Sequence, residues 1–290
     1  MKTYKWYWII TLSAILVLPL LLLFFHHQPV LKTSGTPQAI QASSSNQSET
    51  PKDPGSSPKP TPKPAPKPTT KPAPKPQIQW GIDTANLVDD AFYKCVIDNY
   101  GKPGFVGRYL ETKQDISTGL TSEEATYLHK QGIKIIPIFN HFTNATSYKN
   151  GVAEAKEAIS YAQKIAIPKG VAIFADIEPK YPVDEGFIRG WVDTLVSSPY
   201  KPGIYGVFTK ENSITSSFQT AATKNENVQK YTIIWSSNPE AGITTKIKAP
   251  KFQPNTPQNV KASVWQYGMD GKTCNVDTDL VQINGIQFLW

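Results

Sequence analysis

The chain has 290 residues and a formal net charge of +7 at neutral pH. Nine lysines and two acids in residues 1–77 account for the whole of this charge, whereas basic and acidic residues balance over residues 78–290. Because nucleic-acid-binding domains carry a basic patch on their folded surface, the neutral globular region lacks the main signal of that class. We therefore expect no nucleic-acid partner.

The N-terminal segment is strongly apolar. Residues 6–25 are almost all hydrophobic and follow Lys2 and Lys5. A run of about 20 apolar residues can span a bilayer as a helix, and the flanking lysines place the N-terminus inside the cell. The residues after the run offer no small-residue cleavage site. We predict a transmembrane anchor over residues 1–27, in a single-pass membrane protein whose C-terminal domain is extracellular. The alternative is a cleaved signal peptide and a secreted protein.

Residues 28–77 form a region of different composition, rich in Ser, Thr, Lys and Pro, with Pro-Lys repeats between Pro54 and Pro76. This composition cannot bury a hydrophobic core, so we predict a disordered linker. Alternating proline favours an extended polyproline II spacer that holds a domain away from a membrane. Its lysines either attract the polyanions of a cell wall or of anionic lipid, or serve solubility alone.

Strand-like runs alternate with helix-like runs over residues 78–290, as in a parallel sheet built from βα units. Thr121-Ser-Glu-Glu124 has the pattern of a capping box at a helix start. Apolar residues recur at helical spacing over residues 152–165 and 187–195. Eight strands are predicted, over residues 78–83, 105–110, 133–140, 171–178, 203–207, 232–236, 263–267 and 276–283.

The helical periodicity fades beyond Gln219, and residues 238–261 contain no clear amphipathic stretch. The last three strands are therefore expected to lack full helical crossovers. We predict an α/β fold, a TIM-type (β/α)8 barrel whose last three βα units are irregular. An open, doubly wound sheet is the alternative, but no glycine-rich nucleotide-binding pattern follows the first strand.

One predicted strand ends in two acids, in the sequence Val171-Ala-Ile-Phe-Ala-Asp-Ile-Glu-Pro179. Because strand side chains alternate between faces, Phe174, Asp176 and Glu178 share one face. A neighbouring carboxylate and partial burial both raise the pKa of a carboxyl group, which lets a glutamic acid serve as a general acid near neutral pH. The alternative is a solvated strand end with paired acids.

Polar and aromatic residues stand at the ends of the other predicted strands. The active site of a TIM-type barrel lies at the C-terminal strand ends, where aromatic rings can stack on sugar faces and acids and amides can bind sugar hydroxyls. We therefore predict a carbohydrate pocket. Its catalytic residues are Glu178 and Asp176, and its substrate-binding residues are Asp83, Arg108, Asn140, Tyr205, Trp235, Gln266, Asp277 and Asp279, with Tyr109 beside Arg108.

Metal and cofactor sites are not predicted. The globular region contains His129 and His141 as its two histidines and has no zinc-binding pattern. The Asp277-x-Asp279 pair lacks the further oxygen ligands of a calcium loop. We expect neither a metal ion nor a cofactor.

The chain has two cysteines, Cys95 and Cys274, near the two ends of the globular region. In an exported protein they can pair and close a long loop. Two buried free thiols are the alternative, and neither cysteine lies in a catalytic motif.

Six segments stand in a fixed order along the globular region: Gly81-Ile-Asp83, Phe174-Ala-Asp-Ile-Glu178, Gly203-Ile-Tyr-Gly206, Ile234-Trp235, Trp265-Gln-Tyr267 and Val276-Asp-Thr-Asp279. In this order they resemble the barrel of glycoside hydrolase family 25 lysozymes. They are still more similar to the bacterial glycoside-hydrolase-like domain of unknown function that is related to that family. In particular, Arg108-Tyr109-Leu110 is typical of the hydrolase-like group rather than of the lysozymes.

The resemblance implies a site directed at peptidoglycan, in which Glu178 is the acid and Asp176, Asp83 and Asp277 complete a ring of carboxyl groups. Glu178 would protonate the glycosidic oxygen, while Asp176 either raises the pKa of Glu178 or orients an N-acetyl group of the substrate. Arg108 is expected to form an ion pair with one carboxylate of the ring. The predicted protein is an exported glycoside hydrolase-like enzyme of the cell envelope. The alternative is a non-catalytic module that binds cell-wall glycan.

Overall fold

The computed structural model describes residues 77–290 of the chain. The predicted membrane anchor and the predicted Pro/Lys-rich linker lie outside the described residues. Within the described part, no helix combines the length and the apolar character needed to cross a membrane.

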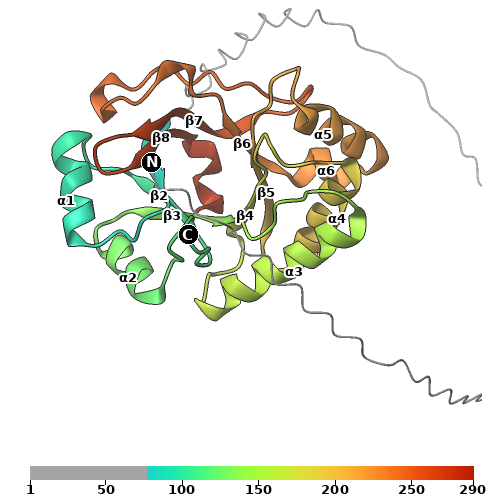
Figure 1. Ribbon diagram of the computed structural model, residues 1–290, viewed down its shortest axis with the longest axis horizontal. Helices are drawn as coiled ribbons and strands as arrows, with labels where there is room; N and C mark the ends of the chain where they lie inside the picture. The colour runs from blue at the N-terminus through green and yellow to red at the C-terminus, as the bar shows by residue number, and fades with distance from the viewer. Residues whose placement is uncertain (1–76) are drawn as a thin grey trace, which may run out of the picture. The chain divides into compact units, whose positions relative to one another are not determined.

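Eight strands close into a barrel in which each strand pairs with its neighbours in chain order, and β8 pairs with β1 (Figure 1). All eight predicted strands are present, with ends that differ by a few residues from the prediction. The strands are β1 (Ile78–Thr84), β2 (Phe105–Tyr109), β3 (Lys134–Phe139), β4 (Ala172–Asp176), β5 (Lys201–Gly206), β6 (Ile233–Ser237), β7 (Ala262–Gly271) and β8 (Val276–Gln282).

The last strand departs from the predicted (β/α)8 pattern, because β8 runs antiparallel to both β7 and β1. Only residues 272–275 separate β7 from β8. A parallel connection needs a crossover of roughly a dozen residues or more, whereas a few residues suffice for a hairpin. As a result β8 begins at the barrel mouth where β1 to β7 end, and Asp277 pairs in register with Asp83.

The helices surround the strands in Figure 1. The Thr121 hydroxyl caps α2 by accepting a hydrogen bond from the Glu124 amide at 3.1 Å, as the capping box predicts. The helices are α1 (Asp90–Asn99), α2 (Ser122–Lys130), α3 (Tyr148–Lys164), α4 (Glu185–Val196), α5 (Ser213–Lys224) and α6 (Glu226–Tyr231).

The connection between β5 and β6 is more helical than the sequence pattern predicts. Both α5 and α6 lie in this connection, and they bury Phe218, Ala221 and Val228. The first of these helices is rich in Ser and Thr and the second has only six residues, which weakens their periodic signal. The connection between β6 and β7, drawn in orange in Figure 1, has only short 3-10 turns at Pro239–Ala241 and Lys246–Lys248.

The barrel interior is filled with large side chains below its mouth. Phe105, Phe174, Trp235 and Val281 belong to this inner cluster. A Cβ atom on Gly81 of β1 would lie 2.5 Å from the ring of Phe105, so the inner packing needs glycine there. Since the interior is closed by these rings, a ligand can enter only at the mouth.

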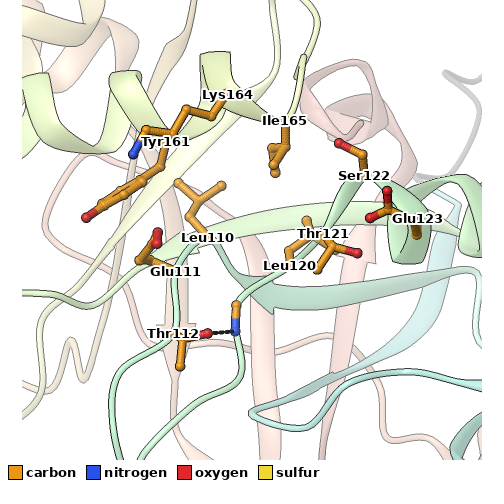
Figure 2. Close-up of a pocket in the computed structure, with 11 residues that line it drawn as sticks. Leu110, Glu111, Thr112, Leu120, Thr121, Ser122, Glu123, Tyr161, Lys164 and Ile165 are labelled. Carbon is orange, nitrogen blue, oxygen red and sulfur yellow. Dashed lines mark hydrogen bonds between the residues drawn. The ribbon is translucent and has the colours of Figure 1, made fainter.

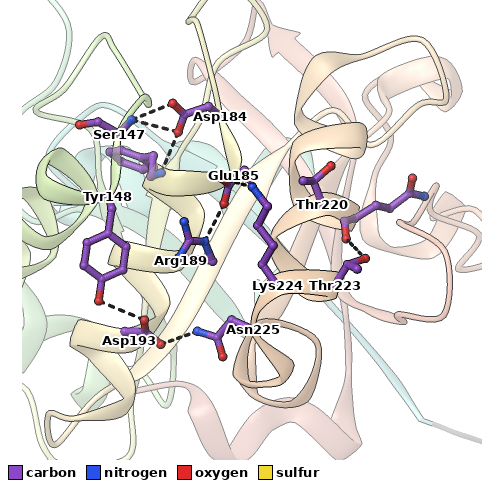
Figure 3. Close-up of polar contacts among 12 residues, drawn as sticks. Ser147, Tyr148, Asp184, Glu185, Arg189, Asp193, Thr220, Thr223, Lys224 and Asn225 are labelled. Atoms are coloured by element: carbon purple, nitrogen blue, oxygen red, sulfur yellow. Dashed lines mark hydrogen bonds and ion pairs between the residues drawn. The ribbon is translucent and has the colours of Figure 1, made fainter.

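Polar contacts join α3, α4 and α5 on the outer wall of the barrel (Figure 3). Asp193 of α4 accepts hydrogen bonds from the Tyr148 hydroxyl at 3.1 Å and from the Asn225 amide at 2.6 Å. Glu185 contacts both Arg189 and Lys224 at 2.6 Å. Ion pairs on the surface contribute little each, so the buried apolar faces of these helices are the main source of stability.

A disulfide joins Cys95 of α1 to Cys274 in the turn between β7 and β8, with Cα atoms 5.9 Å apart. The two residues are 179 positions apart in the sequence. The bond therefore links the first helix of the barrel to its last hairpin, next to the antiparallel strand that closes the sheet.

Replacement of both cysteines by alanine is expected to lower the free energy of unfolding by about 5 kcal/mol, the chain-entropy value for so long a loop. Urea unfolding of the wild-type protein and of the double variant measures the difference. Wild-type protein treated with a reductant is the control, and it should match the double variant. Equal stability of the variant and the oxidised protein would contradict the expectation.

Candidate active site

Acids from three strands meet in one pocket at the barrel mouth. Asp83 ends β1, Asp176 ends β4, Glu178 lies two residues further on, and Asp277 lies at the start of β8. The pocket encloses about 310 Å³, including space open to solvent. Its remaining lining residues are Tyr109, Ile138, Tyr205, Trp235, Gln266 and Met269.

The alternation of β4 places its acids as the sequence predicts. Phe174 lies inside the barrel, with its ring edge-on to Trp235 at 5.5 Å between centroids. Ile173, Ala175 and Ile177 lie in the core outside the barrel, among the helices. Asp176 and Glu178 therefore continue the inner face of the strand into the pocket.

Gln266 holds two of the acids together. Its Nε2 donates hydrogen bonds to Asp83 Oδ2 at 2.8 Å and to Asp277 Oδ2 at 3.2 Å. Its Oε1 accepts hydrogen bonds from the Tyr205 hydroxyl and the Ser237 hydroxyl, both at 2.8 Å. Both ends of the amide are thus engaged within the protein, so Gln266 organises the pocket as well as lining it.

Asp279 lies beneath the pocket and does not line it. Its side chain is fully buried, and its Oδ1 accepts a hydrogen bond from Trp235 Nε1 at 3.0 Å. Burial, followed by the negative charge of Asp83, raises the pKa of Asp279 well above its ordinary value. The predicted contact of Asp279 with substrate is therefore wrong, because the residue supports Trp235 and Asp83 from below.

Arg108 points away from the pocket, so it forms no ion pair with a carboxylate of the ring and does not lie where it was predicted to bind substrate. Its side chain is fully buried behind β2, where Nε lies 2.6 Å from Glu124 Oε1. Its other nitrogens donate hydrogen bonds to the carbonyl oxygens of Thr84 and Thr118. Neighbouring side chains of a strand point to opposite faces of the sheet. Because Tyr109 faces the pocket, Arg108 faces α2.

Asn140 is buried next to the pocket but is not among its lining residues. Its side-chain nitrogen lies 3.3 Å from the Ser117 hydroxyl, to which it donates a hydrogen bond. Its Oδ1 has no hydrogen-bond partner among the described residues. The predicted role of Asn140 in substrate binding therefore stays a prediction.

Burial raises the pKa of each acid at the mouth. For Asp83 and Asp176, burial is the largest cause, and the negative charge of Glu178 adds to it. Burial also raises the pKa of Glu178, while Lys180, a hydrogen bond with Asp176, and Lys113 lower it. The pKa of Asp277 rises to about 8, first through burial and then through the charge of Asp83.

Asp176 and Glu178 both line the pocket, and the negative charge of Glu178 adds to burial in raising the pKa of Asp176. Burial is the largest cause that raises the pKa of Glu178. The role of Asp176 expected from the sequence stays a prediction. The pair titrates as a unit.

Two residues at the site were not predicted from the sequence. Ser237 shares the inner face of β6 with Trp235 at spacing two, which was a usable signal, and it donates a hydrogen bond to Gln266. Met269 lines the pocket because β7 extends beyond the predicted strand.

A second pocket lies outside the barrel between the start of α2 and the end of α3 (Figure 2). Leu110, Leu120 and Ile165 contribute apolar surface to it, with Glu111 and Lys164 among the polar lining residues. It contains none of the predicted site residues.

Among the described residues, no group of three or more potential metal-ligating side chains is placed to hold a metal ion.

The closed barrel and its mouth of acids and aromatics define a glycoside-hydrolase-like protein. Residues 101–283 match the family described as the Rv2525c-like, glycoside hydrolase-like domain. The chain belongs to this family. No curated protein matches the chain.

The chain is similar to several solved structures. The crystal structure of an uncharacterised B. stearothermophilus protein is 38% identical, with a TM-score of 0.71, and covers 73% of this chain and 100% of its own. Rv2525c, a Tat-secreted protein of Mycobacterium tuberculosis crystallised with L-tartrate, is 16% identical, with a TM-score of 0.48, over 70% of this chain and 95% of its own. A family GH25 lysozyme from Aspergillus fumigatus is 12% identical, with a TM-score of 0.47, over 73% of this chain and 98% of its own.

Arg108→Met is expected to lower the free energy of unfolding by about 3–5 kcal/mol, because it leaves the Glu124 carboxylate buried and unpaired. The exposed pair of Lys94 and Asp98 on α1 offers a control. Lys94→Met should change stability by no more than about 0.5 kcal/mol. Urea unfolding measures both, and equal losses for the two variants would contradict the assignment.

Stability is expected to fall with rising pH because of Asp277. Its pKa rises from 3.8 to about 8 on folding, so the folded state binds the extra proton between these values. The free energy of unfolding should therefore decrease from about pH 4 to about pH 8 and then level off. Asp277→Asn should make this decrease shallower, whereas Asp98→Asn on the surface should not. Urea unfolding at several pH values measures the slopes, and parallel curves for wild type and Asp277→Asn would be the contrary result.

Proposed function

We propose that the protein is an exported glycoside hydrolase of the cell envelope that cleaves peptidoglycan or a related wall glycan, with Glu178 as general acid and Asp176 as its partner. The observation that carries the proposal is the convergence of Asp176 and Glu178 with Asp83 and Asp277 in one pocket at the barrel mouth. Family membership supports the reaction class.

Glu178 has the properties of a proton donor. Its side chain is partly exposed and lines the pocket, while burial of the rest raises its pKa. A raised pKa keeps a carboxyl protonated at a pH where an ordinary glutamate is ionised. In the proposed reaction the Glu178 proton moves to the glycosidic oxygen as the bond from that oxygen to the anomeric carbon breaks.

Asp176 suits a supporting role. Two residues that share one strand face stand roughly 6.5–7 Å apart at Cα, which does not place their carboxyls on opposite sides of a sugar. Asp176 is only 5% exposed, and its Oδ1 has no partner among the described residues. This oxygen is free to accept a hydrogen bond from the N–H of an N-acetyl group. The acetyl oxygen would then attack the anomeric carbon, as in substrate-assisted glycosidases.

The surroundings of the pair fit a sugar. Tyr109, Tyr205 and Trp235 contribute aromatic surface to the pocket. The disulfide between Cys95 and Cys274 supports export, because such bonds persist in oxidising compartments. The predicted apolar N-terminal segment supports a location at the cell membrane, from which the barrel would reach the wall.

Glu178→Gln is expected to abolish release of soluble muropeptides from peptidoglycan, since glutamine cannot donate the proton, and to leave binding intact. Residues 77–290 suffice for the assay, because they form the closed barrel and a crystallised relative aligns over its whole length with 73% of the chain. Wild-type release should fall as pH rises through the raised pKa of Glu178, because the acid must be protonated.

Glu240→Gln is the matched control, since Glu240 is an exposed glutamate in the connection that follows β6 and does not line the pocket. It should release muropeptides like the wild type. Binding of wild type and Glu178→Gln to peptidoglycan without release by either would overturn the enzymatic function in favour of a glycan-binding module.

A further inference from the structure

The base of the barrel, which is the end opposite the mouth where β1 to β7 begin, carries a lysine at the start of six successive strands. Lys134 and Lys201 are the first residues of β3 and β5, and they pair in register with Phe105 and Ala172, the first residues of β2 and β4. Parallel strands in register begin at the same end of a barrel, so the six side chains start from one face. These lysines, here called the lysine ring, are Lys102, Lys134, Lys169, Lys201, Lys230 and Lys261.

The charges of the lysine ring are not neutralised by the domain itself. Lys134 is half-buried and the other five lysines are exposed. The ion pairs found among the described residues involve none of the six. Neighbouring strands lie about 5 Å apart, well within a Debye length of about 10 Å, so these like charges act together and favour an anionic partner. The connections that lead into β2–β5 and β7 contain no acid over residues 100–104, 131–133, 165–171, 197–200 and 249–261.

The mouth has the opposite character. Its pocket is lined by four acids, Asp83, Asp176, Glu178 and Asp277. An anionic surface is therefore attracted to the base of the barrel more strongly than to the mouth, and a domain that docks on such a surface leaves its mouth free.

Exposed apolar side chains stand beside the lysine ring. Ile247 is 96% exposed and lies between Lys246 and Lys248. The Lys246 ammonium donates a hydrogen bond to the Lys102 carbonyl oxygen at 3.1 Å, which places this turn next to the ring. Tyr231, which follows Lys230, is 42% exposed. Lysines with tyrosine and aliphatic side chains are the residues that enter the interface of an anionic bilayer, whereas a soluble polyanion gives Ile247 no role.

The direction of the chain also favours a membrane at this end. β1 begins at the base, where Ile78 pairs in register with Gln282 at the end of β8. The residues before Gln77 therefore join the domain on the side of the lysine ring. They include the Lys-rich region and the predicted membrane anchor, so the proposed location at the cell membrane brings a bilayer to the base.

We propose that the base of the barrel is a docking surface for an anionic lipid bilayer. The lysine ring contacts the phosphate headgroups, and Ile247 and Tyr231 enter the interface beside them. The docked domain directs its acidic mouth away from the membrane. This surface goes beyond the proposed hydrolase function and does not depend on it.

The test is sedimentation of residues 77–290, which lack the Lys-rich region, with lipid vesicles. The wild type should bind vesicles of equal parts phosphatidylglycerol and phosphatidylcholine, and should not bind phosphatidylcholine alone. A lysine at an anionic surface contributes about fivefold to affinity. A triple variant with Lys169→Gln, Lys201→Gln and Lys261→Gln should therefore bind the mixed vesicles about 100-fold more weakly.

The matched control removes three exposed lysines from the mouth half of the domain. Lys149 begins the helix that follows the β3 loop, Lys210 lies in the loop after β5, and Lys272 lies in the turn between β7 and β8. The triple variant with Lys149→Gln, Lys210→Gln and Lys272→Gln has the same net charge as the base variant and should bind like the wild type. Equal weakening of the two triple variants would overturn the proposal.

Ile247→Ser tests the lipid contact without any change of charge. It should weaken vesicle binding about tenfold, the lower end of the range for burying an aliphatic side chain. Ile116→Ser is its control, because Ile116 is 57% exposed in the loop after β2 at the mouth and should not affect binding.

Soluble poly(glycerol phosphate) distinguishes a polymer partner from the bilayer. If residues 77–290 bind this polymer and not the mixed vesicles, the bilayer proposal is wrong and the base binds a wall polyanion. Absence of binding to both would also overturn it. Muropeptide release plays no part in these measurements, so the docking surface and the hydrolase function stand or fail separately.

Discussion

The geometry of the site depends on the antiparallel closure of the barrel by β8. The turn of residues 272–275 is too short for a crossover, so β8 must run back beside β7 and then pair with β1. A parallel β8 would bring the other end of the strand to the mouth, with Gln282 there instead of Asp277. Antiparallel pairing instead sets Asp277 opposite Asp83, close enough for one amide group, that of Gln266, to donate to both. The disulfide at Cys274 fixes the same turn.

Much of this arrangement could be predicted from the sequence, and the failures have physical causes. Strand-like runs located every strand, and the alternation in Phe174, Asp176 and Glu178 placed the pair on the inner face. The same rule, applied to Tyr109, excludes Arg108 from the pocket, yet the expectation from the sequence put both residues at the rim. Asp279 was wrongly placed in the pocket because the sequence does not show how far side chains fill the barrel interior toward its mouth. Here Trp235 fills the space that separates Asp279 from solvent.

Burial has two consequences for the acids at the mouth. It raises their pKa values, which makes protons available at a pH where exposed carboxyls have lost them. It also reduces the stability of the fold as pH rises, because the unfolded chain loses these protons first. Arg108 and Glu124, in contrast, form a buried ion pair behind β2, with Nε and Oε1 2.6 Å apart. The fold thus separates a charge-balanced region, which supports the sheet, from an acid-rich mouth.

That separation bears on the choice between an enzyme and a binding module. Hydroxyl groups of a glycan are bound well by amides, aromatic rings and exposed carboxylates, and none of these needs a raised pKa. A mouth with four lining acids, all with raised pKa values, lowers stability near neutral pH without improving the binding of a neutral sugar. Proton transfer is the task for which such groups are suited, and sites that perform it often reduce the stability of their fold.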